Sequence, residues 1–287
     1  MIPRRSVLYM PGANARAMEK ARGLDCDSII FDLEDAVAAD SKELGRQQVC
    51  AALEAGGYGE RELVVRINGL DTPWGAEDLA ATAALPIAGM LFPKVERSSQ
   101  VQAIDAALEA AGQSELPRWY MLETPLALLD LRDLVSQSPK LAVLVMGTSD
   151  LVKELRGSHV PGRANLAYAL QSCIAVARAH AVDILDGVHL DFRNLEGVSA
   201  ACEEGRAMGF DGKTLIHPAQ IEAANAAYGP DAQTVSQAQR VLEAWQAAQA
   251  EGRGVVELDG QLIENLHAAE AERTLEFARR IAARRSA

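Results

Sequence analysis

The chain has 287 residues, of which 49% are hydrophobic and 24% are charged, and its formal net charge is -12. This length and apolar content are sufficient for one large folded domain with a substantial core, which excludes a disordered chain. The negative charge argues against nucleic acid and anionic membranes as partners, because both bind to basic surfaces.

The N-terminal segment and the cysteines favour a cytoplasmic protein. No run of roughly 18 apolar residues occurs, and the apolar stretch Val7–Pro11 is too short for the core of a signal peptide. Cys26, Cys50, Cys173 and Cys202 lie far apart and form no C-x-x-C pair, which argues against a zinc site and a disulfide framework. We therefore expect reduced cysteines and no membrane segment.

Short apolar runs typical of buried β-strands recur along the chain. In order they are Ser6–Met10, Ser28–Leu33, Leu63–Ile67, Gly89–Pro93, Trp119–Leu122, Ala142–Met146, Ile184–Leu190 and Lys213–Ile216. Segments able to form helices lie between them, most with apolar residues at i, i+3 and i+4. These segments are Ala39–Ala55, Trp74–Ala84, Ser99–Ala111, Pro125–Val135, Arg163–Ala181, Leu195–Met208 and Pro218–Tyr228.

The alternation of strand and helix predicts a parallel sheet. The runs are apolar on nearly every residue, as expected for strands that are covered on both faces. Eight repeats within roughly 230 residues favour a closed (β/α)8 TIM barrel over an open Rossmann sheet. We expect residues 1–230 to form the catalytic barrel and residues 231–287 to form a helical C-terminal cap or oligomerisation segment.

Polar residues end the predicted strands, where barrel enzymes place their chemistry. Glu123 ends the fifth run and Asp150 follows the sixth, so the two carboxylates are expected to lie on adjacent strands. Two carboxylates with ligand oxygens and waters are a usual site for Mg²⁺, and Mn²⁺ accepts similar oxygen ligands. The alternative is that such acids cap the helices that follow the strands.

Arg66 ends the third run directly after two valines, so its charge needs a partner. A ligand carboxylate held in a bidentate fork is one candidate, and a structural ion pair with Asp32 or Glu34 is the other. Asp32, which ends the second run, is also a candidate catalytic residue. Lys94 could form a Schiff base, as in some barrel aldolases, but the acids favour a metal route and a salt bridge is the simpler explanation for the lysine.

The N-terminal segment is basic within an acidic protein. Its cations are Arg4, Arg5, Arg16, Lys20 and Arg22. A turn at Met10–Asn14 precedes a helix that carries Arg16 and Lys20, and exposed helix N–H groups beside two cations suit a phosphate. A solvated basic face is the alternative.

In these motifs the chain resembles the HpcH/HpaI aldolase and citrate lyase β-subunit superfamily. The likeness covers the chain from near Arg4 to the last helix, and it is greatest to the CoA-ester lyases, such as malyl-CoA and citramalyl-CoA lyases. The order and spacing of the motifs carry it. They are Arg5–Gly12, Asp32–Asp35, Val65–Pro73, Pro93–Lys94, Leu122–Thr124, Gly147–Leu151, Gly212–Lys213 and Ile216–Pro218.

The resemblance implies a role for each matched residue. Glu123 and Asp150 match ligands of Mg²⁺. Arg66 matches the arginine that holds the keto acid and its developing oxyanion. Tyr9 and Lys20 match positions that contact CoA.

Other positions are matched less closely or depart from the family pattern. The usual serine and arginine after the Pro-Gly turn are absent, so Arg16 is expected to take over a CoA phosphate contact. Val188 and His189 fall at another substrate contact, and His189 could also act as an acid, a base or a structural residue. Glu264 stands where malyl-CoA lyases carry a catalytic aspartate, and a displacement of about 1 Å can cost about 100-fold in rate.

The resemblance implies an Mg²⁺-dependent lyase that acts on CoA thioesters. The predicted reaction is the reversible cleavage of a 3-hydroxy-3-carboxyacyl-CoA into an acyl-CoA and a 2-keto acid such as glyoxylate or pyruvate. The family also implies a homotrimer or hexamer whose C-terminal segment reaches over a neighbouring subunit's site. The alternatives are a malyl-CoA-type thioesterase, a CoA-independent pyruvate aldolase, and a citrate-lyase-like subunit that is inactive without a partner.

Overall fold

The structure, a computed structural model, describes residues 2–286 and divides into two compact units. The larger unit is Arg4–Asn225, and the smaller contains the chain from Ala226 onward and the N-terminal residues up to Pro3. Among residues 2–286, no helix combines the length and the apolar character needed to cross a membrane. The four cysteines are free thiols, as predicted, and three of them are buried.

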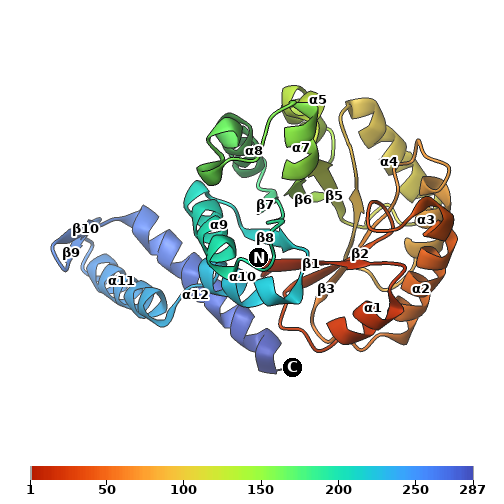
Figure 1. Ribbon diagram of the computed structural model, residues 1–287. Helices are drawn as coiled ribbons and strands as arrows, with labels where there is room; N and C mark the ends of the chain where they lie inside the picture. Colours follow the sequence, from red (N-terminus) through yellow and green to blue (C-terminus); the bar gives the residue numbers. More distant parts are fainter. Residues whose placement is uncertain (1, 287) are drawn as a thin grey trace. The chain divides into compact units, whose positions relative to one another are not determined.

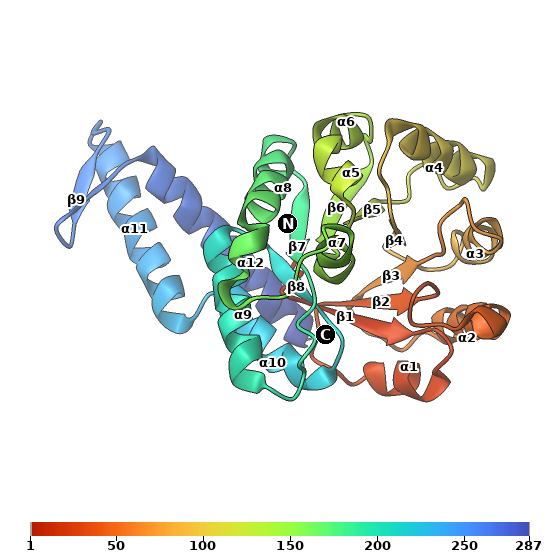
Figure 2. The same cartoon turned by 45° about the horizontal axis from the view of Figure 1, so that its top comes forward.

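Eight parallel strands form a closed barrel in the larger unit, and β8 pairs with β1 to complete the ring (Figure 1). The strands are β1 (Ser6–Pro11), β2 (Ser28–Asp32), β3 (Glu62–Arg66), β4 (Gly89–Phe92), β5 (Arg118–Leu122), β6 (Leu141–Met146), β7 (Asp183–Asp186) and β8 (Gly212–Leu215). Figure 2 shows the connecting helices on the outside of this ring. The predicted (β/α)8 TIM barrel is therefore confirmed.

The predicted strand boundaries agree with the structure to within about one residue, except at the seventh strand. The sequence prediction extended this strand to Leu190, but β7 ends at Asp186. A Cβ atom on Gly187 would lie 2.5 Å from Thr148 Oγ1, and Asp186 Oδ1 accepts a hydrogen bond from Gly187 N–H at 2.8 Å. The chain turns there, so His189 lies in a loop and does not end a strand.

Helices lie between the strands and after β8, and the last of them, α10, crosses the boundary between the two units. They are α1 (Ala15–Ala21), α2 (Lys42–Ala55), α3 (Gly75–Thr82), α4 (Ser98–Ala110), α5 (Pro125–Leu129), α6 (Leu131–Ser136), α7 (Thr148–Glu154), α8 (Ala167–Ala179), α9 (Leu195–Met208) and α10 (Ile221–Tyr228). The segment predicted to form one helix at Pro125–Val135 is two, and they meet at Asp130. The helix predicted from Arg163 begins at Ala167, because Gly162 and Arg163 have positive φ angles.

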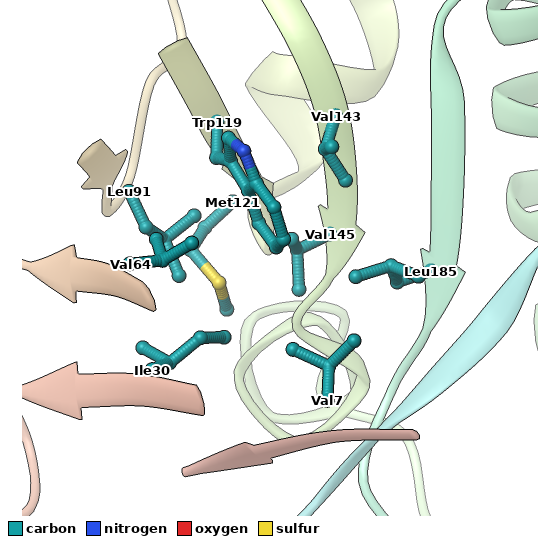
Figure 3. Close-up of a cluster of buried hydrophobic side chains, with 9 residues drawn as sticks. All are labelled: Val7, Ile30, Val64, Leu91, Trp119, Met121, Val143, Val145 and Leu185. Carbon is teal, nitrogen blue, oxygen red and sulfur yellow. The ribbon is translucent and has the colours of Figure 1, made fainter. Parts of the chain in front are cut away.

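Apolar side chains fill the inside of the barrel (Figure 3). They are Val7, Ile30, Val64, Leu91, Trp119, Met121, Val143, Val145 and Leu185. Tyr9, which follows Val7 by two residues on β1, packs against this cluster. Because the interior is a packed core and not a channel, ligands can reach only the ends of the strands.

Two arginines of the basic N-terminal segment are buried at the amino end of the barrel. Arg4 donates two hydrogen bonds to Glu62, at 2.8 and 2.7 Å, and lies 5.2 Å from the centre of the Trp119 ring. Arg5 donates two to Asp27, at 2.8 and 2.9 Å. Their charges are neutralised inside the fold, so they are not part of a ligand-binding patch.

The smaller unit is built on two helices that lie side by side, α11 (Ala232–Ala250) and α12 (Asn265–Ser286). An antiparallel hairpin of β9 (Val256–Leu258) and β10 (Gln261–Ile263) connects them. The unit has its own apolar cluster, formed by Ala238, Val241, Trp245, Ile263, Ala268, Ala271 and Leu275. It therefore has a core that does not depend on the barrel interior.

Replacing Gly212 with alanine is expected to destabilise the barrel. A Cβ atom at this position would lie 1.8 Å from the backbone oxygen of Arg4, where β8 begins beside the start of β1. Urea unfolding should show a loss of about 3 kcal/mol or more in the free energy of unfolding. The matched control is Gly23→Ala, because the nearest atom to its Cβ would be 3.9 Å away; an equal loss in both variants would contradict the argument.

Candidate active site

Charged side chains gather where the neighbouring strands β2 to β6 end. Asp32 and Arg66 are the last residues of β2 and β3, and they are direct partners in the register of the two strands. Lys94 follows β4, Glu123 follows β5, and Asp150 lies in the first turn of α7, after β6. The barrel thus brings together strand ends that are far apart in the sequence. Asp32 and Asp150, for example, are 118 positions apart (150 − 32).

Arg66 is buried and bound by two carboxylates. Its Nε and Nη2 atoms donate to Asp32 Oδ1 and Oδ2 at 2.7 and 2.5 Å. Its Nη1 atom lies 2.8 Å from Glu34 Oε2. The sequence left open whether Arg66 forms a structural ion pair with Asp32 or Glu34, and the structure shows ion pairs with both. The bidentate pair with Asp32 already occupies one edge of the guanidinium.

Asp32 uses its carboxylate fully within the protein. Besides the two bonds from Arg66, Oδ1 accepts from Glu34 N–H at 2.9 Å and Oδ2 accepts from Ala36 N–H at 3.2 Å. These four hydrogen bonds hold the carboxylate in one position. It is better suited to orienting Arg66 than to moving a proton.

Lys94 joins two acidic residues. Its Nζ atom lies 2.6 Å from Glu34 Oε1, and its backbone N–H donates to Glu123 Oε1 at 2.9 Å. Partial burial alone would lower the pKa of Lys94, but the hydrogen bond and charge of Glu34 outweigh burial and raise this pKa to about 12. The ammonium stays charged at neutral pH, which disfavours a Schiff-base role.

Lys42 is a buried cation that the sequence analysis did not select. Its ammonium donates to the backbone oxygens of Leu33 and Glu34 at 2.8 and 2.7 Å and to Asn68 Oδ1 at 2.7 Å. It therefore ties the loop after β2 to the loop after β3. A lysine at the start of a helix resembles a solvated residue, so the sequence alone carried no signal for it.

Tyr9 lies below Arg66 at the top of the barrel core. Its ring centre is 4.9 Å from the guanidinium carbon of Arg66, and its hydroxyl donates to Met121 Sδ at 3.3 Å. Burial, opposed in part by the charge of Arg66, raises the pKa of Tyr9 above its ordinary value. Tyr9 is thus a neutral phenol that supports Arg66 from inside the barrel.

Glu123 is buried, and it is not a helix cap. The next residue, Thr124, caps α5 by accepting a hydrogen bond from Ala127 N–H at 3.2 Å. Glu123 Oε1 is bound by Lys94, but Oε2 has no hydrogen-bond partner among the residues that the structure describes. Burial, with the nearby charge of Glu34, raises the pKa of Glu123 to about 7.

Gly147 places the start of α7 against Glu123. Its N–H donates to Leu122 O at 3.0 Å, and a Cβ atom on it would lie 2.7 Å from Glu123 Oε2. Asp150 follows three residues later and is half-buried, and its carboxylate has no hydrogen bond or ion pair within residues 2–286. A side chain larger than hydrogen at position 147 would fill the space beside the unpaired oxygen.

The unpaired oxygen of Glu123 suits a hard cation, and Asp150 stays the predicted second ligand. Glu123 has a buried oxygen without a partner, which is costly unless a cation or a proton meets it. Within the described part of the chain, no group of three or more His, Cys, Asp and Glu residues could hold a metal. A site with two protein carboxylates suits Mg²⁺, which commonly retains waters and ligand oxygens.

Helix α1 carries two exposed cations and follows a turn that packs against the end of β2. Asn14 caps α1 through a hydrogen bond from Ala17 N–H at 3.0 Å, and Arg16 and Lys20 are exposed on the helix. A Cβ atom on Gly12 would lie 2.9 Å from the backbone oxygen of Asp32. The turn before α1 therefore packs against the strand that carries Asp32.

Val188 and His189 lie after β7, which is opposite β3 in the ring of strands. The backbone oxygen of His189 accepts a hydrogen bond from Gln220 Nε2 at 2.9 Å. The ring Nε2 atom of His189 is buried and has no hydrogen-bond partner among the described residues. Burial lowers the pKa of His189, so its ring is neutral at pH 7. The described contacts do not join either residue to Arg66.

Glu264 belongs to the smaller unit. Its N–H donates to His267 Nδ1 at 3.0 Å, and its backbone oxygen accepts from His267 N–H, so it directly precedes α12. Its carboxylate is half-exposed. Its predicted catalytic role stays a prediction.

An apolar cavity of about 280 Å³ is lined by the loop after β3, the end of β4 and α4. Its walls include Phe92, Pro93, Val95 and Ile104. None of the charged residues of the candidate site lines this cavity.

Comparison with known proteins gives consistent matches along the chain. The family model described as HpcH/HpaI aldolase/citrate lyase matches residues 5–218. A (3S)-malyl-CoA thioesterase from Cereibacter sphaeroides is 46% identical over 284 residues, which cover 99% of this chain and 98% of that protein. The citrate lyase subunit beta of Escherichia coli K12 is 33% identical over 267 residues, which cover 91% and 88%.

A solved structure is similar over most of both chains. It is protein CitE from Mycobacterium tuberculosis in complex with magnesium, acetoacetate and coenzyme A. The TM-score is 0.76 at 27% identity, with 95% of this chain and 97% of that chain covered.

Replacing Glu123 with glutamine is expected to change how stability depends on pH in metal-free protein. Because the folded state raises the pKa of this acid from 4.5 to about 7, the folded protein binds the proton more tightly than the unfolded chain. The wild type should therefore lose up to about 3 kcal/mol of unfolding free energy as pH rises through this range. Urea unfolding in EDTA between pH 5 and 8 measures this loss, and identical pH profiles for wild type and Glu123→Gln would refute it.

Proposed function

The chain belongs to the HpcH/HpaI aldolase/citrate lyase family, and on this premise we propose that it hydrolyses the thioester of a 3-hydroxy-3-carboxyacyl-CoA of the malyl-CoA type. The observation that carries the proposal is the 46% identity to a (3S)-malyl-CoA thioesterase over nearly the whole of both chains. The sequence analysis placed carbon–carbon cleavage first and hydrolysis among the alternatives. The higher identity to the thioesterase reverses that order.

Carbon–carbon cleavage to an acyl-CoA and a 2-keto acid is the second candidate. It is favoured by relatives named citrate lyase subunit beta, which are 31 to 35% identical to this chain. Both reactions use a substrate with a thioester, a hydroxyl group and a carboxylate. The same binding residues therefore serve either proposal.

Glu123 and Asp150 are proposed to hold Mg²⁺, with Mn²⁺ as an alternative. The unpaired buried oxygen of Glu123 supports this assignment, and the similar CitE structure contains magnesium. Bound Mg²⁺ would supply positive charge to oxygen atoms of the ligand as a Lewis acid.

Arg66 and Lys94 are proposed to bind the substrate carboxylate and the oxygen that gains negative charge during the reaction. Both stay protonated at neutral pH, and a buried guanidinium stabilises such charge strongly. Asp32 fixes the direction of the guanidinium through its fork, and Tyr9 supports it from below. These two residues position Arg66 and do not need to touch the ligand.

In hydrolysis, a water oxygen forms a bond to the thioester carbonyl carbon and the carbon–sulfur bond breaks. One proton leaves the water, and the CoA sulfur takes up a proton as the free thiol. We propose Glu264 as a carrier of one of these protons, supplied by a neighbouring chain of the predicted homotrimer or hexamer. Arg16 and Lys20 are proposed to bind the phosphates of CoA, with Val188 and His189 at a further substrate contact.

Product analysis is expected to give malate and free CoA from malyl-CoA in the presence of Mg²⁺. Mass spectrometry of all products distinguishes this result from glyoxylate and acetyl-CoA, which would establish the lyase instead. EDTA, Glu123→Gln and Asp150→Asn should each reduce turnover by about 100-fold or more, because each removes transition-state charge stabilisation. Full activity in EDTA would remove the metal from the proposal.

Neutralising Lys20 is expected to weaken the binding of CoA esters and to leave the rate of the chemical step unchanged. Lys20→Gln should raise KM for malyl-CoA by about tenfold with little change in kcat, since a phosphate contact far from the reacting bond is the same in ground and transition states. Lys140→Gln is the matched control, because Lys140 is a lysine paired with Glu115 at the opposite end of the barrel. Equal KM values for all three proteins would exclude Lys20 from CoA binding.

A further inference from the structure

Glu34 connects the two cations of the site, although none of the predicted catalytic or binding roles includes it. Its Oε2 atom lies 2.8 Å from Arg66 Nη1, and its Oε1 atom lies 2.6 Å from Lys94 Nζ. Its side chain is only 10% exposed, whereas that of Lys94 is 49% exposed. One carboxylate thus spans the position between the cations where a ligand carboxylate is expected to bind.

The backbone of Glu34 is held in place from both sides. Its N–H donates to Asp32 Oδ1 at 2.9 Å, and its backbone oxygen accepts from Lys42 Nζ at 2.7 Å. The loop therefore cannot move away without breaking bonds inside the protein. Rotation about the side-chain bonds of Glu34 is the available movement.

The negative charges at this position already match or exceed the positive charges without a ligand. Arg66 and Lys94 contribute two positive charges, Asp32 and Glu34 contribute two negative charges in direct contact with them, and the exposed Asp35 carboxylate lies 3.7 Å from Arg66 Nη1. A ligand carboxylate on the same cations would be buried beside Asp32 and Glu34, which is unfavourable. Asp32 holds Arg66 through two bonds, so Glu34, with one bond to each cation, is the carboxylate that can be exchanged.

We propose that Glu34 occupies the ligand-carboxylate position on Arg66 and Lys94, and that carboxylate ligands bind by displacing its side chain. The inference rests on the proposed function in one respect, namely that the substrate carries a carboxylate on its acyl group. An acyl-CoA without this carboxylate leaves Glu34 in place between the cations. Glu34 then sets how tightly the site binds carboxylated acyl groups, because only these groups compete with its side chain.

The test compares the binding of malate, pyruvate and glyoxylate to wild type and Glu34→Gln by calorimetry at saturating Mg²⁺. Removing the competing charge should lower the Kd of these ligands by about tenfold, the scale of one partly buried ion pair. Asp35→Asn is the matched control. The Asp35 carboxylate lies 3.7 Å from the same Nη1 atom but is 59% exposed, so its removal should change Kd by less than about twofold.

A second measurement tests selectivity in the full enzyme. Glu34→Ala and Glu34→Gln should bind malyl-CoA more tightly relative to acetyl-CoA than wild type does, because only the carboxylated ligand has to displace Glu34. Thermal unfolding of each variant checks that the fold is kept.

Weaker or unchanged binding of the carboxylates by both Glu34 variants would overturn the inference, because Glu34 would then orient Arg66 in the ligand complex as well. An equal gain in carboxylate affinity for Asp35→Asn would show that the effect comes from the general charge of the site, and this result would also overturn the inference. The inference would likewise be overturned if neither wild type nor the variants bound carboxylates. The product analysis of malyl-CoA turnover decides the proposed function separately, because it does not depend on the Glu34 variants.

Discussion

The fork between Arg66 and Asp32 is the contact on which the candidate site depends. The two residues are register partners at the ends of β2 and β3, so the pairing of the strands already sets their backbones side by side. Burial makes each charge unfavourable alone and the pair acceptable together. With the guanidinium fixed in this way, Glu34 and Lys94 extend a chain of opposite charges to the backbone contact with Glu123.

Close approach of backbones shapes the other half of the site. Glu123 and the start of α7 are adjacent because Gly147 has no side chain to separate them. Gly187 performs a similar role at the end of β7, where the chain passes close to Thr148. The carboxylate of Glu123 can therefore remain buried while one of its oxygens stays unpaired.

Much of this arrangement could be predicted from the sequence, because strands covered on both faces leave continuous apolar runs with polar residues at their ends. The barrel and the gathering of Asp32, Arg66 and Glu123 follow from that pattern. Lys42 could not be found in this way, since its three acceptors come from two loops whose folded paths the sequence does not specify. The end of β7 was misplaced because apolar residues continue past Asp186 into the loop. The burial of Arg4 and Arg5 was also missed, since a cluster of cations near a terminus looks the same whether solvated or paired.

The pairing of β1 with β8 has a consequence for synthesis of the protein. Strand β1 is synthesised before β8, the strand that covers its open edge and ends at Leu215. Until that strand emerges, the backbone N–H and C=O groups on this edge are available to other nascent chains on the same message. The barrel unit is therefore most exposed to misassembly during translation, and slow decoding before codon 215 would lengthen that period.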